Sequence, residues 1–177
     1  NTSAQVYIAY CFAPVAGYSS FGSYTGNSSS NIIQTGFEPA FLLIKRTNST
    51  GWWNIWDNKR NTSNPRNTIL SANLNSADLT STALNINFLS NGFELTTNNG
   101  DLNENGSTYI YIAFAADPSA APALPDSFGI SGYVGNASTK IVNNSGFSPS
   151  LVWQKNRSAG NSQNWNDAVR GPGNFIF

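Results

Sequence analysis

In the stretch TYIYIAF (residues 108–114), two tyrosines alternate with two isoleucines and a phenylalanine. This two-residue period is that of a β-strand, and both of its faces are apolar enough to be covered. The stretch AFLLIKR (residues 40–46) is also apolar on both faces through Ile44, which predicts a central strand of a sheet. We therefore expect strands that are packed on both sides.

The stretch NINFLSNGFELTT (residues 85–97) places Asn91 and Gly92 between two apolar runs. We predict a hairpin with these residues at the centre of a type I′ turn, because both central positions of that turn need a positive φ. Two further Asn-Gly pairs mark turns, and Asn, Ser, Thr and Gly disfavour helix interiors. The sequence thus predicts an all-β fold of antiparallel β-sandwich or jelly-roll modules in tandem.

An internal repeat supports the tandem arrangement. The stretch YTGNSSSNIIQTGFEPAFLLIKR (residues 24–46) recurs as YVGNASTKIVNNSGFSPSLVWQKN (residues 133–156), and Lys45, Asp57 and Arg60 recur 110 positions later. The first residues, NTSAQVYIAYCF, are similar to NGSTYIYIAFAA further along the chain. We therefore expect a piece of a tandem array rather than a single domain.

The offsets between matching residues set the expected boundaries. Pro and Ala are frequent in the longer connector, as is typical of a linker. The expected parts are the final strand of a preceding repeat (1–12), a connector (13–20), a complete β-sandwich repeat (21–116), a Pro/Ala linker (117–127) and the first half of a following repeat (128–177).

The composition excludes several classes of protein. Nine basic residues balance nine acidic ones, so no basic patch is expected for nucleic acid or an anionic membrane. No apolar run is long enough to cross a membrane. Without His and with one Cys, the chain cannot form a His/Cys zinc site, a Ser-His-Asp or Cys-His centre, or an internal disulfide. Cys11 aligns with Ala115 and is expected to be a buried structural thiol.

The stretch DLNENG (residues 101–106) has the spacing of a calcium loop. Asp101, Asn103 and Asn105 place oxygen atoms at the first, third and fifth positions before a glycine, but Ile112 occupies the twelfth position, where a bidentate Glu is required. Two interpretations remain open. The residues form a tight polar turn between two strands, which this composition favours, or they bind calcium together with other ligands. No other cofactor is expected.

The stretch GWWNIWDNKR (residues 51–60) is a candidate glycan-binding site. The indole rings of Trp52 and Trp56 would stack on sugar rings, and Asp57 and Arg60 would bond the hydroxyl groups.

A second interpretation of this stretch is structural. A strand here would place Trp53 and Ile55 on one face, where we expect both to be buried. Asp57 and its partner recur as Asp167 and Arg170, which favours a structural ion pair or turn over an active site.

Paired carboxylates for glycoside cleavage must lie roughly 5–10 Å apart. Glu38 and Glu94 could meet across a sheet, but Ser148 replaces Glu38 in the repeat. We therefore expect a protein that is not an enzyme.

The order of motifs resembles a known group of proteins. The succession YTGN, GFEPAFLLIKR, WDNKR, FLSNGFEL and GSTYIYIAFA is similar to repeats in large virion proteins of marine phages and cyanophages, in tail fibres and other surface appendages, often beside concanavalin-like lectin folds. The resemblance covers the complete unit and both partial ones. It implies a β-sandwich module on the outside of a virus particle, with no known catalytic residues.

The expected function is a non-enzymatic virion structural protein, a phage tail-fibre or appendage module exposed on the particle surface and contacting host-surface glycans. The alternatives are a capsid decoration protein, a bacterial surface adhesin or extracellular filament subunit, and a secreted concanavalin-like glycoside hydrolase. Expected partners are other virion proteins, further copies of the chain (a trimer, by analogy with phage fibres) and host cell-surface polysaccharide. The expected location is the virion surface or another extracellular site.

Overall fold

The computed structural model describes residues 11–115, 132–137, 149, 151–160, 164–168 and 175–176. The linker expected at 117–127 lies outside the described residues, as does most of the strand expected at 1–12. Nothing helical in this part of the chain is long and apolar enough to span a membrane.

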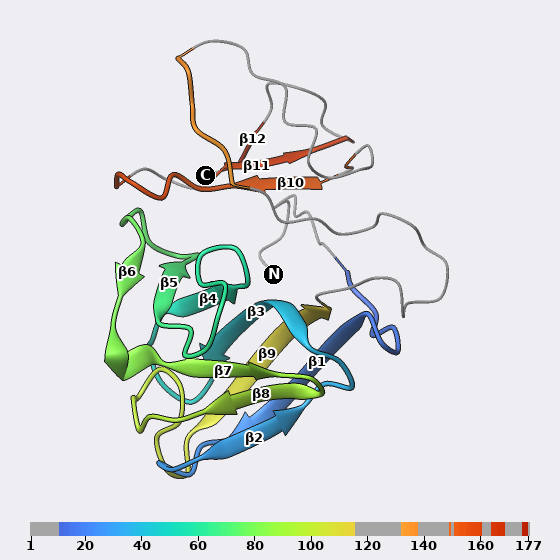
Figure 1. Ribbon diagram of the computed structural model, residues 1–177, viewed down its shortest axis with the longest axis vertical. Coiled ribbons are helices and arrows are strands. Elements are labelled where there is room, and N and C mark those ends of the chain that lie inside the picture. The colour runs from blue at the N-terminus through green and yellow to red at the C-terminus, as the bar shows by residue number, and fades with distance from the viewer. Residues whose placement is uncertain are drawn as a thin grey trace, which may run out of the picture.

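Two antiparallel sheets, built from β1 to β9 between residues 19 and 115, make up what we call the first unit (Figure 1). The larger sheet has six strands, in the order β1 (Ser19–Thr25), β9 (Thr108–Ala115), β3 (Pro39–Arg46), β4 (Trp53–Asp57), β5 (Thr68–Ser71) and β6 (Leu79–Thr80). The smaller sheet has three, in the order β2 (Asn31–Gln34), β8 (Gly92–Leu95) and β7 (Ile86–Leu89). A 3₁₀ turn, η1 (Thr82–Leu84), precedes β7. The predicted all-β, antiparallel class is confirmed.

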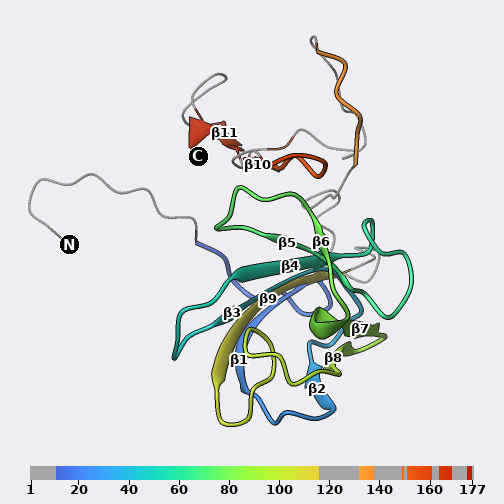
Figure 2. The same ribbon diagram turned by 90° about the vertical axis from the view of Figure 1, so that its left-hand side faces the viewer.

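The two sheets face each other and enclose the main core (Figure 2). From the smaller sheet, Phe93 and Leu95 are fully buried, and from the larger sheet Leu42, Trp56 and Tyr109 are fully buried. Burial of apolar side chains between two sheets is the dominant stabilisation of a β-sandwich. The fold is therefore sandwich-like, as the sequence predicts.

The strand expected at residues 108–114 is confirmed as β9, which lies between β1 and β3. Its tyrosines face the main core, while Ile112 and Phe114 point to the opposite, outer face of the larger sheet. The strand expected at residues 40–46 is confirmed as β3, an interior strand between β9 and β4.

The predicted hairpin is confirmed as β7–β8, but its expected turn geometry is wrong. Leu89 pairs with Gly92, so Ser90 and Asn91 form the two-residue connection. Gly92 is needed for a different reason, because a Cβ atom there would lie 2.1 Å from the carbonyl oxygen of Ile33 on β2. The glycine therefore allows close approach of two strands rather than a type I′ turn.

A third sheet, which we call the second unit, follows later in the chain. Its three strands are, in order, β10 (Leu151–Gln154), β11 (Asn164–Asp167) and β12 (Phe175–Ile176). Trp153 pairs with Trp165 across β10 and β11, just as Leu43 pairs with Ile55 across β3 and β4. Both tryptophans lie 110 positions after their counterparts. The repeat seen in the sequence is thus accompanied by the same strand pairing.

Candidate functional site

Two consecutive tryptophans at the start of β4 are exposed to solvent. Trp52 is 39% exposed and Trp53 is 40% exposed. The expected burial of Trp53 is therefore wrong, whereas Ile55 is buried as expected, at 2% exposure. The outer face of the larger sheet is covered around Ile55 but not at the start of β4, where Trp53 lies.

The surroundings of Trp53 are set by the strand register. Lys45 on β3 is the cross-strand neighbour of both Trp53 on β4 and Ile110 on β9. Ile110 is itself 40% exposed. The Asn73 Oδ1 atom accepts a hydrogen bond of 2.9 Å from the backbone N–H of Trp53. We call Lys45, Trp52, Trp53, Asn73 and Ile110 the tryptophan ledge.

The tryptophan ledge combines exposed aromatic surface with polar groups. A single exposed apolar side chain is ordinary, but neighbouring exposed apolar residues mark binding surfaces. The ammonium group of Lys45, the charged group of the ledge, donates hydrogen bonds to the carbonyl oxygens of Arg46, at 2.5 Å, and Ser49, at 3.5 Å. Sequence reasoning found Trp52 but missed the rest, because their grouping depends on the register of three strands.

Trp56 belongs to the core and not to a binding surface. Its side chain is fully buried between the sheets, and its Nε1–H donates a 3.1 Å hydrogen bond to the carbonyl oxygen of Leu84. The expected contact between Trp56 and a glycan is therefore contradicted by its position, since β4 lies inside the sheet and is packed on both faces.

Asp57 and Arg60 form a buried ion pair at the end of β4. The Arg60 Nη2 and Nε atoms both lie 2.6 Å from Asp57 Oδ2. Asp57 Oδ1 accepts hydrogen bonds from the backbone N–H groups of Lys59, at 2.8 Å, and Arg60, at 2.7 Å. The side chains are 8% and 6% exposed. The structural interpretation of this pair is confirmed, and neither group is placed to bond a sugar.

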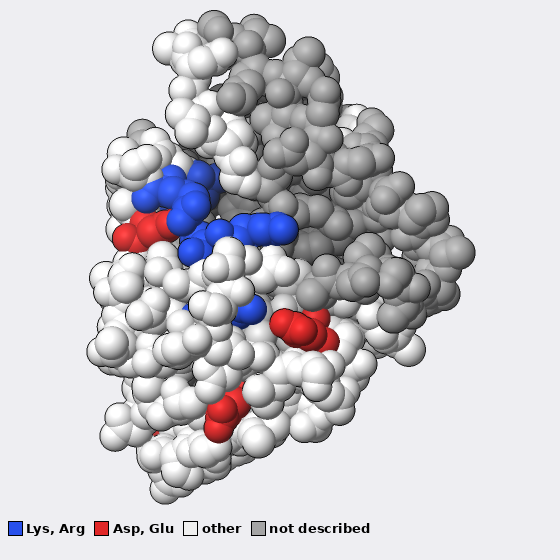
Figure 3. Space-filling model, in the orientation of Figure 1, with Lys and Arg blue, Asp and Glu red and all other residues white. Residues whose placement is uncertain are grey.

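The same pair continues into a small charge cluster at the boundary between the units. Arg60 Nη1 lies 3.8 Å from Asp78 Oδ1, and Arg157 Nε lies 2.7 Å from Asp78 Oδ2. Figure 3 shows Lys and Arg side chains gathered beside acidic ones on this face, while most of the described surface around them is uncharged. This arrangement suits a structural junction better than a catalytic centre.

The structure does not gather the three candidate calcium ligands around one point. The Asp101 carboxylate lies beside Gly51, because a Cβ atom on that glycine would be 2.5 Å from Asp101 Oδ1. The Asn103 side chain is fully buried, and Asn105 is exposed, with its N–H bonded to Ser28 Oγ at 2.9 Å. These residues form turns between β8 and β9, as the polar-turn interpretation predicts.

Asn103 is instead the centre of a hydrogen-bond network. Its Oδ1 atom accepts from the Asn27 N–H, at 3.0 Å, and from Asn31 Nδ2, at 3.1 Å. Its Nδ2 atom donates to the carbonyl oxygens of Ser29, at 2.6 Å, and Thr97, at 3.1 Å. Since both ends of the amide are used, a metal ion could bind Asn103 only by displacing these contacts.

Glu94 makes structural hydrogen bonds across the smaller sheet. Its Oε1 atom accepts from Ser30 Oγ at 2.7 Å, and its Oε2 atom accepts from Asn87 Nδ2 at 2.9 Å. These hydrogen bonds, first that from Asn87 and then that from Ser30, lower the pKa of Glu94. Glu38 takes no part in these two hydrogen bonds and is exposed just before β3.

Cys11 is exposed, so its expected burial is wrong. It lies in a segment before β1 that has no strand structure, and its alignment with buried Ala115 therefore does not carry over to burial.

The chain matches the family described as Domain of unknown function (DUF7483) over residues 1–118 and 125–177, and it belongs to that family. The gap between the two matched stretches falls within the Pro/Ala linker expected at residues 117–127. Neither a curated protein nor a solved structure matches the chain. The family description names no activity.

Proposed function

We propose that the protein is a non-enzymatic structural module of a virus particle, carried on a tail fibre or another surface appendage, and that its tryptophan ledge contacts glycans of the host surface. The observation that carries the glycan contact is the exposure of Trp52 and Trp53, at 39% and 40%, with Lys45 as the cross-strand neighbour of Trp53. The exposed face of an indole stacks on the apolar face of a sugar ring, while polar neighbours bond its hydroxyl groups.

The virion setting is supported by the resemblance of the motif order to marine phage appendage repeats. The neutral, Asn/Ser/Thr-rich composition suits this setting, since an uncharged surface does not attract nucleic acid or anionic membranes. Repetition along an appendage would turn weak single contacts into strong attachment. The ledge lies on the larger sheet, apart from the buried core, so sugar contact would not disturb the fold.

The glycan contact is tested with polysaccharide extracted from candidate host cells and immobilised on beads. We expect the chain to bind, and the double substitution Trp52→Ala with Trp53→Ala to weaken binding by at least about tenfold, because aromatic residues dominate contacts of this kind. The control is Ile32→Ala, which removes another exposed apolar side chain, 52% exposed, from β2 in the smaller sheet.

If the double tryptophan variant binds normally and Ile32→Ala does not, the glycan contacts the smaller sheet and the proposed site is contradicted. Binding to host cells that survives removal of all surface polysaccharide would contradict a glycan receptor. Release of sugar from the polysaccharide, lost on Glu94→Gln, would favour the glycoside hydrolase alternative.

A further inference from the structure

The outer face of the larger sheet, on the side away from the main core, carries a continuous apolar row. Phe21, Ile112, Leu43, Ile55 and Leu70 are successive cross-strand neighbours on β1, β9, β3, β4 and β5. Three of these residues, Leu43, Ile55 and Leu70, are buried, at 6%, 2% and 8% exposure. Because they point away from the sandwich core, another part of the chain must cover them.

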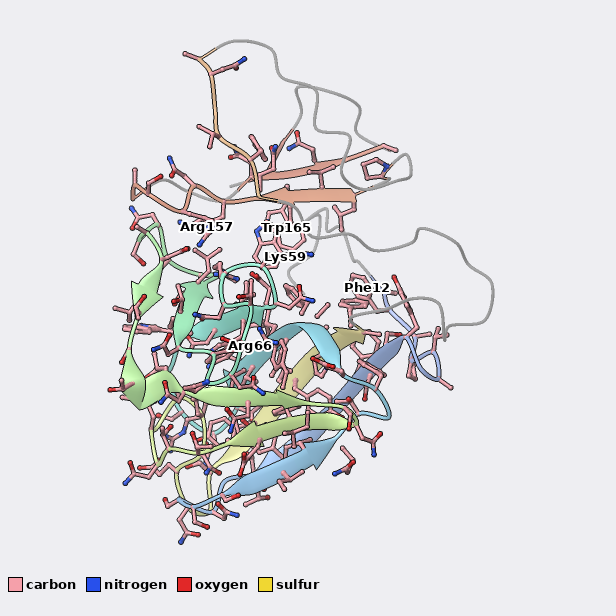
Figure 4. All side chains as sticks on the ribbon, viewed as in Figure 1. Phe12, Lys59, Arg66, Arg157 and Trp165 are labelled. Carbon is pink, nitrogen blue, oxygen red and sulfur yellow. The ribbon has the colours of Figure 1, made fainter. Side chains whose placement is uncertain are left out.

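The cover comes from the second unit. Trp153 of β10 packs against the cluster formed by Leu43, Ile55 and Leu70. Its ring also lies 6.3 Å from that of Phe41, edge to face. Trp165 of β11 stacks on Trp153, with ring centroids 4.5 Å apart. Figure 4 shows Trp165 on the side of its sheet that faces the first unit.

The covering residues hold the same positions in their unit as the covered residues hold in theirs. Trp153 and Trp165 are cross-strand neighbours, and their counterparts 110 positions earlier are Leu43 and Ile55, which are also cross-strand neighbours. Each unit therefore presents its outer face, through equivalent strands, to the outer face of the other.

Polar contacts border this apolar contact beyond the end of β10. After β10, Lys155 Nζ donates a 3.1 Å hydrogen bond to the carbonyl oxygen of Leu74, and the Asp78 N–H donates one of 3.3 Å to the carbonyl oxygen of Arg157. The Arg157 side chain bonds Asp78 Oδ2 at 2.7 Å. An apolar centre with a polar rim is the usual anatomy of a specific interface.

We propose that the outer face is a pairing surface for the outer face of another unit, and that units of this family close on one another in face-to-face pairs. An interface that uses the same patch on both partners is complete once two partners have met, so a third unit cannot join through that face. The side chains at equivalent positions differ in size: Trp153 and Trp165 in the second unit are larger than Leu43 and Ile55 in the first. Large side chains that meet smaller ones pack without crowding, which favours the pairing.

The pairing is tested in the whole chain by exchanging the residues at equivalent positions. Leu43→Trp would crowd the interface and Trp153→Leu would leave it underfilled, so each substitution alone is expected to lower the midpoint of thermal unfolding by several degrees. The double exchange restores one tryptophan and one leucine, and we expect it to recover at least half of the combined loss. The control combines Leu43→Trp with Trp52→Leu, whose effects should add.

The result that would overturn the proposal is simple addition of the two losses in the double exchange. A second measurement covers the case in which Leu43→Trp fails to fold. In a Cys11→Ser background, the pair Asp78→Cys with Arg157→Cys should form a disulfide within one chain. The control pair, Ser30→Cys with Arg157→Cys, should not form one, because Ser30 lies in the loop before the smaller sheet. Absence of the first disulfide, or its formation only between chains, would contradict a pair closed within the chain.

Discussion

A Cβ atom added to Gly26 would lie 2.2 Å from the carbonyl oxygen of Glu104, so the backbones of two distant turns are in direct contact. The Gly26 N–H donates to the Ser107 carbonyl oxygen at 2.8 Å, and the Gly106 N–H donates to the Gly26 carbonyl oxygen at 3.0 Å. The glycine of the repeated YTGN motif is thus required by backbone contact with the DLNENG turn.

Gly26→Ala is expected to destabilise the protein by on the order of 3 kcal/mol, because the added methyl group forces these turns apart. Equilibrium unfolding in urea measures the change. Gly100→Ala is the control, since the nearest atom to its added Cβ would be the flexible Arg46 Nη1 at 3.4 Å. Equal stability of the two variants would contradict the backbone contact.

Asn103→Asp is expected to cost roughly 3 kcal/mol. The substitution replaces a donor with an acceptor opposite the carbonyl oxygens of Ser29 and Thr97, and it buries a charge with no cation beside it in the network. Unfolding in urea again gives the value. Asn105→Asp, at an exposed position two residues on, should change stability by no more than about 0.5 kcal/mol.

Arg60→Leu is expected to destabilise the chain by about 3–5 kcal/mol, because the Asp57 carboxylate would keep its buried position and lose its cation. Lys59→Leu is the matched control, since Lys59 is exposed and only its backbone N–H bonds Asp57. Binding of glycan should be unchanged in both folded variants. A loss of binding by folded Arg60→Leu would return this pair to the binding site.

Glu94 is expected to add a pH-dependent contribution to stability. Hydrogen bonds lower its pKa in the folded state, so the contribution is present above the unfolded value of about 4.3 and is lost as the pH falls through the folded pKa. Glu94→Gln should therefore flatten the fall in the unfolding midpoint between about pH 5 and pH 3. Asn87→Ala should raise the Glu94 pKa in an NMR titration, and an unchanged value would contradict the assigned cause.

Calcium at millimolar concentration is expected to leave the midpoint of thermal unfolding unchanged, because the Asn103 amide is already saturated with protein contacts. A bound ion present at 100 times its dissociation constant would add about 2.7 kcal/mol of stability. A rise in the midpoint that disappears in Asp101→Asn would establish the calcium loop instead of the polar turn.

The sequence predicts the strands where the apolar pattern extends over about seven residues. The alternation at 108–114 and the continuous apolar run at 40–46 both specify interior strands, and both are found as β9 and β3. The short β4 was harder to predict: its alternation indicates a buried face with Trp53 and Ile55, but Trp53 is exposed, and Ile55 and Trp56 on opposite faces are both buried. Burial of the Trp56 face and exposure of Trp53 follow from the neighbouring sheet and the second unit, which a local pattern does not contain.

The candidate site shows the same limit. Trp52 stands out in the sequence as a tryptophan, but Ile110 comes near Trp53 only because Lys45 on β3 is the cross-strand neighbour of both. The Asn103 network likewise links residues 27 to 31 with a turn more than seventy positions away. Contacts between residues so far apart in the chain depend on the order of strands in the sheets. The alternation of apolar and polar residues does not specify that order.

The proposed place of the protein on the surface of a virus particle is tested by electron microscopy of source particles labelled with an antibody against this chain. We predict label on tail fibres or other appendages, at positions that reach the host surface. Label spread over the head would identify a capsid decoration protein. Absence of label from every virus particle would contradict the account and favour a bacterial surface adhesin or filament.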